Sequence, residues 1–467
     1  MGFDTCSGDK SMNNKSQTID MINGPLIRNM FIFAIPLMLS SLMQMLFNSA
    51  DTIIVGKFAG QEALAAVGAT GSIIFFLTAT FMGMSMGANV TIARMIGRGQ
   101  LDKIRAAVHT SYFLAIAGGT IMIILGLLFS PFMLRLVETP ANIIDRSLLY
   151  MRIFFSGSIF NMIYNFGSAV LRSQGDTKRP TLFLALSGVI NVLLNLFFVV
   201  VLKISVAGVA IATVISQFVA CSLVTRSLML ETGPTHLDLK EIRMDPQMAK
   251  DIISIGLPAG LQGMMFSLSN VVIQSGVNSF GSTVVAGNSA AANIENYVYI
   301  GTGAFTSACM TFTGQNAGAG RLDNIRKIMF TTLWLTVLSG MVIGFIGWYK
   351  GEFFLSLFTN SHEVIDAGMY RLQLVCLFLF LNGLLDVFVA SMRGMGYSSF
   401  PTVMTLAGIC GLRLIYLWTY FPAHKTLSAL YFCFPLSWTV TSILQAGLWI
   451  ILFRKYQRSL DKEIQAG

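Results

Sequence analysis

The sequence predicts an all-α polytopic membrane protein, with twelve transmembrane helices in two six-helix lobes related by a parallel pseudo-twofold repeat. Three observations support this fold class. Hydrophobic residues make up 54% of the 467 residues and charged residues only 11%, whereas soluble proteins hold about 25% charged residues. Apolar runs of membrane-spanning length recur along the chain, and the second half repeats motifs of the first half.

The apolar runs define the expected helices. About 20 consecutive apolar residues are needed for a helix to cross a bilayer. In chain order the runs lie at 27–50, 63–90, 106–130, 147–171, 181–202, 206–229, 251–278, 284–312, 328–349, 368–391, 401–421 and 428–453. Glycine is frequent within them, as is usual where helices pack closely in lipid. Each run is therefore expected to form one membrane-spanning helix.

The two halves of the chain repeat one series of motifs. Asp102 in RGQLDKIRAAVHTS recurs as Asp323 in GRLDNIRKIMFTT, 221 residues later. LRSQGDTKRPT recurs as MRGMGYSSFPT at the same spacing, and Pro36 in FAIPLMLSSL recurs as Pro258 in IGLPAGLQGM. Because six spans return the chain to the same side of the membrane, the halves are expected to be parallel repeats, a plan that secondary transporters commonly use.

The basic residues indicate topology rather than a nucleic-acid partner. The net charge is +9, but the Lys and Arg residues cluster in alternate loops, which is the positive-inside pattern of membrane proteins. We therefore expect a multi-pass protein of the cytoplasmic (inner) cell membrane with both termini in the cytoplasm. The expected parts are a cytoplasmic tail (1–24), the N-lobe (25–230), a cytoplasmic linker (231–250), the C-lobe (251–453) and a second cytoplasmic tail (454–467).

Motifs of other functional classes are absent or out of context. GMSMG at 83–87 fits the G-x-S-x-G pattern, but it lies in a predicted span rather than at a strand–turn–helix junction, so no hydrolase is expected. The sequence has no G-x-x-x-x-G-K-[ST] motif, which excludes an ATP-driven pump within this chain. The six Cys and four His are dispersed, so we expect no disulfide, no structural metal and no cofactor.

Asp51 is the first candidate functional residue. It follows the uncharged run FIFAIPLMLSSLMQMLF, and IIVG continues the apolar sequence beyond it. An Asp at the centre of a membrane helix costs roughly 2.5–3.5 kcal/mol on insertion scales, so it faces protein or water. One interpretation places Asp51 at the outer interface, either solvated or capping a helix. The other is a carboxylate that exchanges a proton or binds Na⁺.

Amide and hydroxyl side chains accompany Asp51 in spans four to six, namely Asn165, Asn191, Asn195 and Thr213. Asn191 and Asn195 are four residues apart and therefore share a helix face. Polar residues of this kind often only join neighbouring helices. Since a carboxylate lies in the same half, a polar pocket is the alternative prediction.

The spans of the second half contain Glu295, Asp386 and Arg413. One positive and two negative groups in apolar helices invite pairing with Arg413, which predicts a structural buried ion pair. The alternative is that the carboxylate left unpaired meets a cationic substrate or a coupling ion.

The chain resembles the MATE family, the multidrug and toxic compound extrusion transporters, over nearly all of its length after residue 20. The resemblance rests on FAIPLMLS, NSADTIIVGKFAGQEALAAVGATGS, GMSMGANVTIARMIGRGQ, LRSQGDTKRPT, NVLLNLFFVV, GVAIATVISQ and TFTGQNAGAGR. It is strongest to the bacterial branch called DinF-like or YoeA-like. The family implies twelve helices in two lobes that form a V, and efflux coupled to the entry of H⁺ or Na⁺.

The resemblance also implies an ion site in the N-lobe. The matching positions are Asp51, Tyr150, Asn165, Asn191 and Thr213, of which Asp51, Asn191 and Thr213 would ligate Na⁺ if this were the ion. Many relatives carry a second Asp where NVLLN has Asn195, so this chain departs from a site with two acids.

A C-lobe site known in another bacterial branch is not matched. Its Glu falls at Phe266 and its Asp at Asn382, while Asp386, one helical turn later, is a candidate substitute.

The expected function is secondary active efflux of amphipathic, cationic small molecules in antiport with H⁺ or Na⁺ by alternating access, carried out by a functional monomer. The alternatives are a flippase for lipid-linked precursors from the same superfamily, which would need a basic central cavity, and a membrane-embedded enzyme, for which no nucleophile–base pair is visible. The partners expected are a small-molecule substrate and the lipid bilayer, without nucleic acid.

Overall fold

The computed structural model describes residues 19–466, and these residues are predominantly helical. The predicted tail over 1–24 lies mostly outside the described residues. The N-terminal half contains α1 (Leu26–Ile54), η2 (Val55–Ala59), α2 (Gln61–Arg98), α3 (Leu101–Leu136), α4 (Ile144–Ser156), α5 (Ser158–Ser173), α6 (Lys178–Asn195), η3 (Leu196–Val201), α7 (Ser205–Met229) and η4 (Leu239–Glu241).

The C-terminal half repeats this plan. It contains α8 (Pro246–Asn278), α9 (Ser282–Gly318), α10 (Leu322–Tyr349), α11 (Gly351–Ser356), α12 (His362–Arg371), η5 (Leu372–Cys376), α13 (Leu379–Gly394), α14 (Ser399–Thr405), η6 (Leu406–Gly411), α15 (Leu412–Thr419), η7 (Phe421–Ala423) and α16 (Leu427–Ala466). The linker between the halves ends at Asp245, whose carboxylate accepts hydrogen bonds from the first backbone N–H groups of α8.

Within residues 19–466, ten of the helical passes are long and apolar enough to cross a membrane. The other two passes correspond to the predicted spans at 147–171 and 284–312. The first is divided at Gly157 into α4 and α5, and the second is α9, which carries Glu295. The twelve predicted spans are thus all helical, which agrees with the expected fold class.

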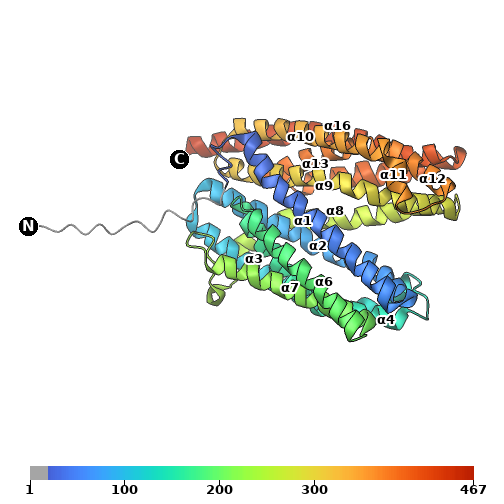
Figure 1. The fold of residues 1–467 in the computed structure, drawn as a ribbon. Helices are drawn as coiled ribbons and strands as arrows, with labels where there is room; N and C mark the ends of the chain where they lie inside the picture. The colour runs from blue at the N-terminus through green and yellow to red at the C-terminus, as the bar shows by residue number, and fades with distance from the viewer. Residues whose placement is uncertain (1–18, 467) are drawn as a thin grey trace, which may run out of the picture.

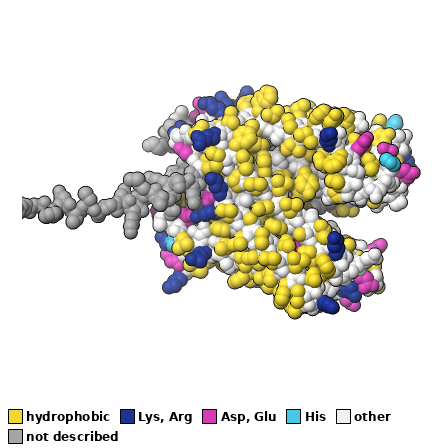
Figure 2. All heavy atoms as spheres, viewed as in Figure 1, with side chains coloured by type: hydrophobic (Ala, Val, Ile, Leu, Met, Phe, Trp, Pro, Cys, Tyr) yellow, Lys and Arg dark blue, Asp and Glu magenta, His cyan; other side chains and the backbone are white. Residues whose placement is uncertain are grey.

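The helices form two lobes that meet at one end and diverge at the other (Figure 1). The described start of the chain and the end of α16 lie at the end where the lobes meet, which we call the closed end. Figure 2 shows hydrophobic side chains over the sides of both lobes and charged side chains at the two ends, as expected for a bilayer-spanning molecule.

Two helices cross between the lobes at the closed end. The first half of α1 packs on the C-lobe, where the rings of Phe33 and Phe312 lie 5.6 Å apart, and its second half reaches the N-lobe. The start of α8 contacts the N-lobe through Ala249 and Ile252, whereas its end joins the C-lobe core at Val277. The first half of each lobe's first helix thus packs on the other lobe, and its second half packs on its own lobe.

The repeat extends to the backbone conformation. Left-handed glycines occur in pairs 221 residues apart: Gly60 (φ 89°) and Gly281 (φ 92°), Gly99 (φ 67°) and Gly320 (φ 70°), Gly175 and Gly396 (both φ 96°). A side chain is disfavoured at such φ values, so glycine ends the helices or forms the turns at these positions. The same turns thus divide both halves.

Candidate functional site

The carboxylate of Asp51 lies inside the N-lobe, near the end of α1. Asn195, the last residue of α6, donates a hydrogen bond from its amide Nδ2 to Asp51 Oδ1. Each residue is followed by a π-helical segment, η2 after α1 and η3 after α6, and the two segments contact each other. Such segments are frequent at functional sites because they widen a helix locally.

The amides and hydroxyl predicted on α6 and α7 join this pair. Asn195 Nδ2 also donates to Asn191 Oδ1 at 3.3 Å, and Asn191 Nδ2 donates to Thr213 Oγ1 at 3.5 Å. Asn191 and Asn195 are buried, and the Oδ1 atom of Asn195 has no hydrogen-bond partner within residues 19–466. The structure thus brings Asp51, Asn191, Asn195 and Thr213 together, with one buried acceptor left free; we call these four the N-lobe polar cluster.

A cavity of about 320 Å³ adjoins the N-lobe polar cluster, and Asp51, Asn191 and Thr213 line it. Asn165 also lines the cavity, but its amide bonds to Asn161 of the same helix rather than to Asp51. Asp51 does not cap a helix, because α1 continues to Ile54.

Tyr150 lies beside the N-lobe polar cluster without hydrogen-bonding to it among the described residues. It is buried with Ile54 and Val55, and its ring stacks on Phe154 at 6.2 Å. Its position is compatible with a packing role, and its predicted role in ion coupling stays a prediction.

Several residues that line the cavity were missed from the sequence. They are Gln44, Asn48, Asn161, Tyr164 and Ser187. Gln44 and Asn48 lie seven and three residues before Asp51, and Ser187 lies four before Asn191. These spacings place them on the same helix faces as the predicted residues, so the helical period was a signal that could have found them.

The expected ion pairing of Glu295 and Asp386 with Arg413 is wrong. Glu295 on α9 instead pairs with Arg371 on α12, through Nε–Oε1 at 2.6 Å and Nη2–Oε2 at 2.7 Å. Arg413 on α15 faces α16, where its Nε donates to Ser437 Oγ at 2.9 Å and its guanidinium lies 4.5 Å from the Phe434 ring centroid. The cation that neutralises Glu295 is thus supplied by a helix that directly packs on α9.

Asp386 occupies a separate place in the C-lobe. It accepts hydrogen bonds at 3.2 Å from the Tyr299 hydroxyl and from the Asn382 amide one turn earlier. Asp386 and Asn382, the two candidates carried over from the other bacterial branch, are therefore in contact. Phe266 instead packs against the apolar C-lobe core.

Arg393, a further buried cation of the C-lobe, was also missed from the sequence. Its Nη2 donates to Gln262 Oε1 at 2.8 Å and to Thr402 Oγ1 at 3.3 Å. Arg371, Arg393 and Arg413 thus each donate hydrogen bonds to protein groups, and Arg393 Nε is a buried donor without a partner among residues 19–466.

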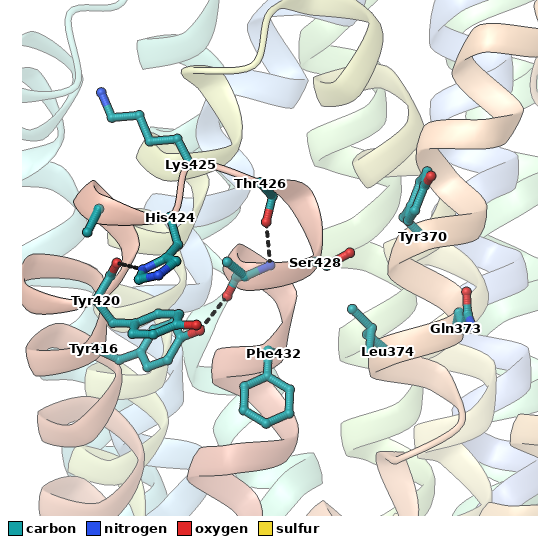
Figure 3. Close-up of a pocket in the computed structure, with 12 residues that line it drawn as sticks. Tyr370, Gln373, Leu374, Tyr416, Tyr420, His424, Lys425, Thr426, Ser428 and Phe432 are labelled. Carbon is teal, nitrogen blue, oxygen red and sulfur yellow. Dashed lines mark hydrogen bonds between the residues drawn. The ribbon is translucent and has the colours of Figure 1, made fainter.

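A larger hollow of about 690 Å³ lies at the end of the C-lobe remote from the termini. Figure 3 shows Tyr370 on one side of it and Tyr416, Tyr420 and His424 on the other. The His424 ring stacks on Tyr420 at 4.2 Å, and Tyr416 donates to the backbone of Ala429. Tyr residues at this depth are typical of a membrane–water interface. No motif or spacing in the sequence singles out this hollow, and its lining residues include no carboxylate.

The fold and the polar sites define a polytopic membrane transporter made of two related six-helix lobes. The family model MatE matches twice, over residues 36–197 and 258–419, once in each half. The chain therefore belongs to the MATE family, as the sequence motifs predicted.

Individual relatives agree with this assignment. The chain is 26% identical to the probable multidrug resistance protein YoeA of Bacillus subtilis, over 92% of this chain and 95% of that protein. It is 24% identical to an FAD transporter of Shewanella oneidensis, over 85% and 88%. Among solved structures, a multidrug resistance MATE family transporter in an outward-facing conformation superposes with a TM-score of 0.88 at 20% identity, covering 95% of this chain and 99% of that one. The YoeA-like branch predicted from the motifs is supported.

Proposed function

We propose that the chain is a secondary active efflux transporter that exports amphipathic, cationic small molecules in antiport with H⁺ or Na⁺. The observation that carries the proposal is the Asp51–Asn195 hydrogen bond beside a polar-lined cavity of the N-lobe. The multidrug resistance name of the YoeA relative supports the substrate class. The FAD transporter relative favours a second candidate substrate, an anionic flavin nucleotide.

Asp51 is the coupling residue of this mechanism. A buried carboxylate is far more stable in a membrane when it is neutralised or paired. Binding of H⁺, or of Na⁺ with the free Oδ1 of Asn195 as an additional ligand, would neutralise Asp51 and weaken its bond from Asn195. The N-lobe polar cluster would then rearrange and release substrate. One charge moving across 100 mV supplies roughly 2.3 kcal/mol for this cycle.

The orientation of the transporter is part of the proposal. The closed end carries the termini and much of the basic charge (Figure 2), so the positive-inside pattern places it in the cytoplasm. The V then opens to the outside, and Asp51, towards the end of α1 remote from the closed end, is reached from there. We further propose that one copy of the chain suffices for transport.

The deciding experiment uses proteoliposomes with pH and Na⁺ gradients imposed separately. A cationic dye and FAD are offered as substrates in parallel. We expect dye transport driven by one of the two gradients, and Asp51→Asn should abolish this response. Asp145→Asn is the matched control, because it neutralises an exposed carboxylate of the same lobe.

Three outcomes would contradict this proposal. Full ion-driven transport by a well-folded Asp51→Asn protein would exclude Asp51 as the coupling residue. Transport of FAD without transport of the dye would favour a flavin nucleotide as the substrate over an amphipathic cation. Translocation of a lipid-linked precursor alone would favour the flippase alternative, which the engaged state of the three C-lobe arginines argues against.

A further inference from the structure

The end of α16 departs from the repeat. At the repeat spacing of 221 residues, α7 (Ser205–Met229) corresponds to 426–450, which matches the start of α16. However, α16 continues to Ala466, whereas the corresponding residues 230–245 hold only the short η4 and no α-helix, so 451–466 have no α-helical counterpart in the first half. We call this segment the α16 extension. The sequence predicted a cytoplasmic tail from 454, whereas the structure continues the helix.

One face of the α16 extension packs on the closed end. The Tyr456 hydroxyl donates to the backbone oxygen of Ala317 at 2.7 Å, and the guanidinium of Arg326 lies 4.9 Å from the Phe453 ring centroid. Tyr456 is buried. Ala317 and Gly318 are the last two residues of α9, and a Cβ built on Gly318 would lie 2.1 Å from the backbone oxygen of Arg94 in α2. The α16 extension thus packs against the end of α9, where the two lobes meet.

The opposite face of the extension is basic. Arg454, Lys455, Arg458 and Lys462 are exposed and border a groove of about 540 Å³ together with Ile451. Their spacings of three, four and seven residues place them along one side of the helix. Asp461 and Glu463 are the acidic residues that flank Lys462 in the sequence, and no ion pair engages the four cations among the described side chains.

The basic face begins where the lipid-facing surface ends. Ile450 and Ile451 are 48% and 64% exposed, as expected for side chains in contact with acyl chains. The cations of the next three turns therefore lie at the depth of the phospholipid headgroups. Clusters of Lys and Arg immediately beyond a transmembrane helix attract anionic lipids, at about 1 kcal/mol for each cation near the surface.

We propose that the outer face of the α16 extension is a binding surface for anionic phospholipid headgroups of the leaflet at the closed end. The four cations supply the charge complementarity, and the exposed isoleucines supply the adjoining acyl-chain surface. Bound lipid would hold the extension in place, so the Tyr456 bond to the end of α9 becomes more stable. The occupant is a membrane lipid rather than a free anion, because the groove is continuous with the lipid-facing surface.

The test measures phosphatidylglycerol binding to the purified full-length protein in nanodiscs. The variant neutralises the four cations (Arg454→Gln, Lys455→Gln, Arg458→Gln and Lys462→Gln). Its matched control neutralises four exposed cations elsewhere on the closed end (Lys103→Gln, Lys240→Gln, Arg243→Gln and Lys250→Gln). Native mass spectrometry counts retained phosphatidylglycerol, and thermal unfolding compares phosphatidylcholine with mixed nanodiscs.

We expect each neutralised cation of the extension to weaken binding about fivefold. Phosphatidylglycerol should raise the melting temperature of the wild type and of the control but not of the variant. A charge-preserving protein with Arg454→Lys and Arg458→Lys should behave as the wild type. Equal lipid retention by variant and wild type would overturn the proposal, as would an equal loss in the control. Stabilisation by inorganic phosphate alone, equal to that by phosphatidylglycerol, would overturn the choice of a membrane lipid.

Discussion

Asn195 is the residue that distinguishes this N-lobe site chemically. Within residues 19–466, its side-chain amide donates the hydrogen bond to the Asp51 carboxylate, and its Oδ1 atom has no hydrogen-bond partner. Hydrogen bonds to charged groups contribute about 1.5–3 kcal/mol, more than bonds between neutral groups. The site therefore stabilises the negative charge of Asp51 with one neutral amide. When that charge is neutralised, the hydrogen bond from Asn195 weakens.

Asn195→Ala should lower ion-driven transport at least tenfold, because roughly 1.4 kcal/mol or more of carboxylate stabilisation is lost. Transport in proteoliposomes is the measurement. Asn161→Ala is the control, since this amide lines the same cavity but bonds to Asn165 rather than to Asp51. If Asn195→Ala transports as well as Asn161→Ala, Asn195 only joins neighbouring helices.

Arg371→Gln should destabilise the C-lobe by about 3–5 kcal/mol, because Glu295 would remain buried without its cation. Thermal unfolding in detergent would report the loss. Adding Glu295→Gln to Arg371→Gln should restore part of the stability, since no charge is then left unpaired. Arg413→Gln should cost less, because Arg413 bonds to a serine rather than to a carboxylate. A larger cost for Arg413→Gln would contradict the observed pairing.

The residues of the N-lobe polar cluster were predictable, whereas the ion partners in the C-lobe were not. Asp51, Asn191 and Asn195 stand out in apolar runs, and their spacing sets their helix face. Glu295 and Arg371 lie on different helices, 76 residues apart. The choice of Arg371 over Arg413 depends on helix rotation and neighbour order, which a single sequence does not contain.

At the scale of elements, α2 and α8 make the most extensive contact between the halves. A Cβ built on Gly83 would lie 2.2 Å from Gly260 N, and one on Gly87 would lie 2.2 Å from Ile252 O. GMSMG, which fits a hydrolase pattern in sequence, thus serves helix packing. Small residues of this kind let helix backbones approach in a membrane.

Gly87→Val should separate α2 from α8, lower the melting temperature and abolish transport, because no side chain fits between the two backbones. Gly68→Ala on the same helix is the control, since a Cβ there meets nothing within 4 Å. The control should be neutral or about 1 kcal/mol more stable, as alanine favours helix over glycine. An unchanged melting temperature of Gly87→Val would contradict the close contact between α2 and α8.

At the scale of the whole molecule, residues that are equivalent in the pseudo-twofold repeat contact each other at the closed end. A Cβ on Gly97 would lie 1.9 Å from Gln315 O, and one on Gly318 would lie 2.1 Å from Arg94 O. Arg94 corresponds to Gln315 and Gly97 to Gly318 at the 221-residue spacing. The ends of α2 and α9 thus meet symmetrically, and the proposed alternating access would require this contact to open.

A disulfide across this contact should stop transport reversibly. Ala93 and Gly314 are also equivalent in the repeat, and a Cβ on Gly314 would lie 3.2 Å from Ala93 Cβ, close to the 3.5–4.5 Å that disulfides need. Ala93→Cys with Gly314→Cys should therefore cross-link on oxidation, which a gel shift after cleavage in the 231–245 linker would reveal. Oxidation should abolish dye transport and reduction should restore it, while each single variant stays active. Undiminished transport by the cross-linked protein would exclude opening at the closed end.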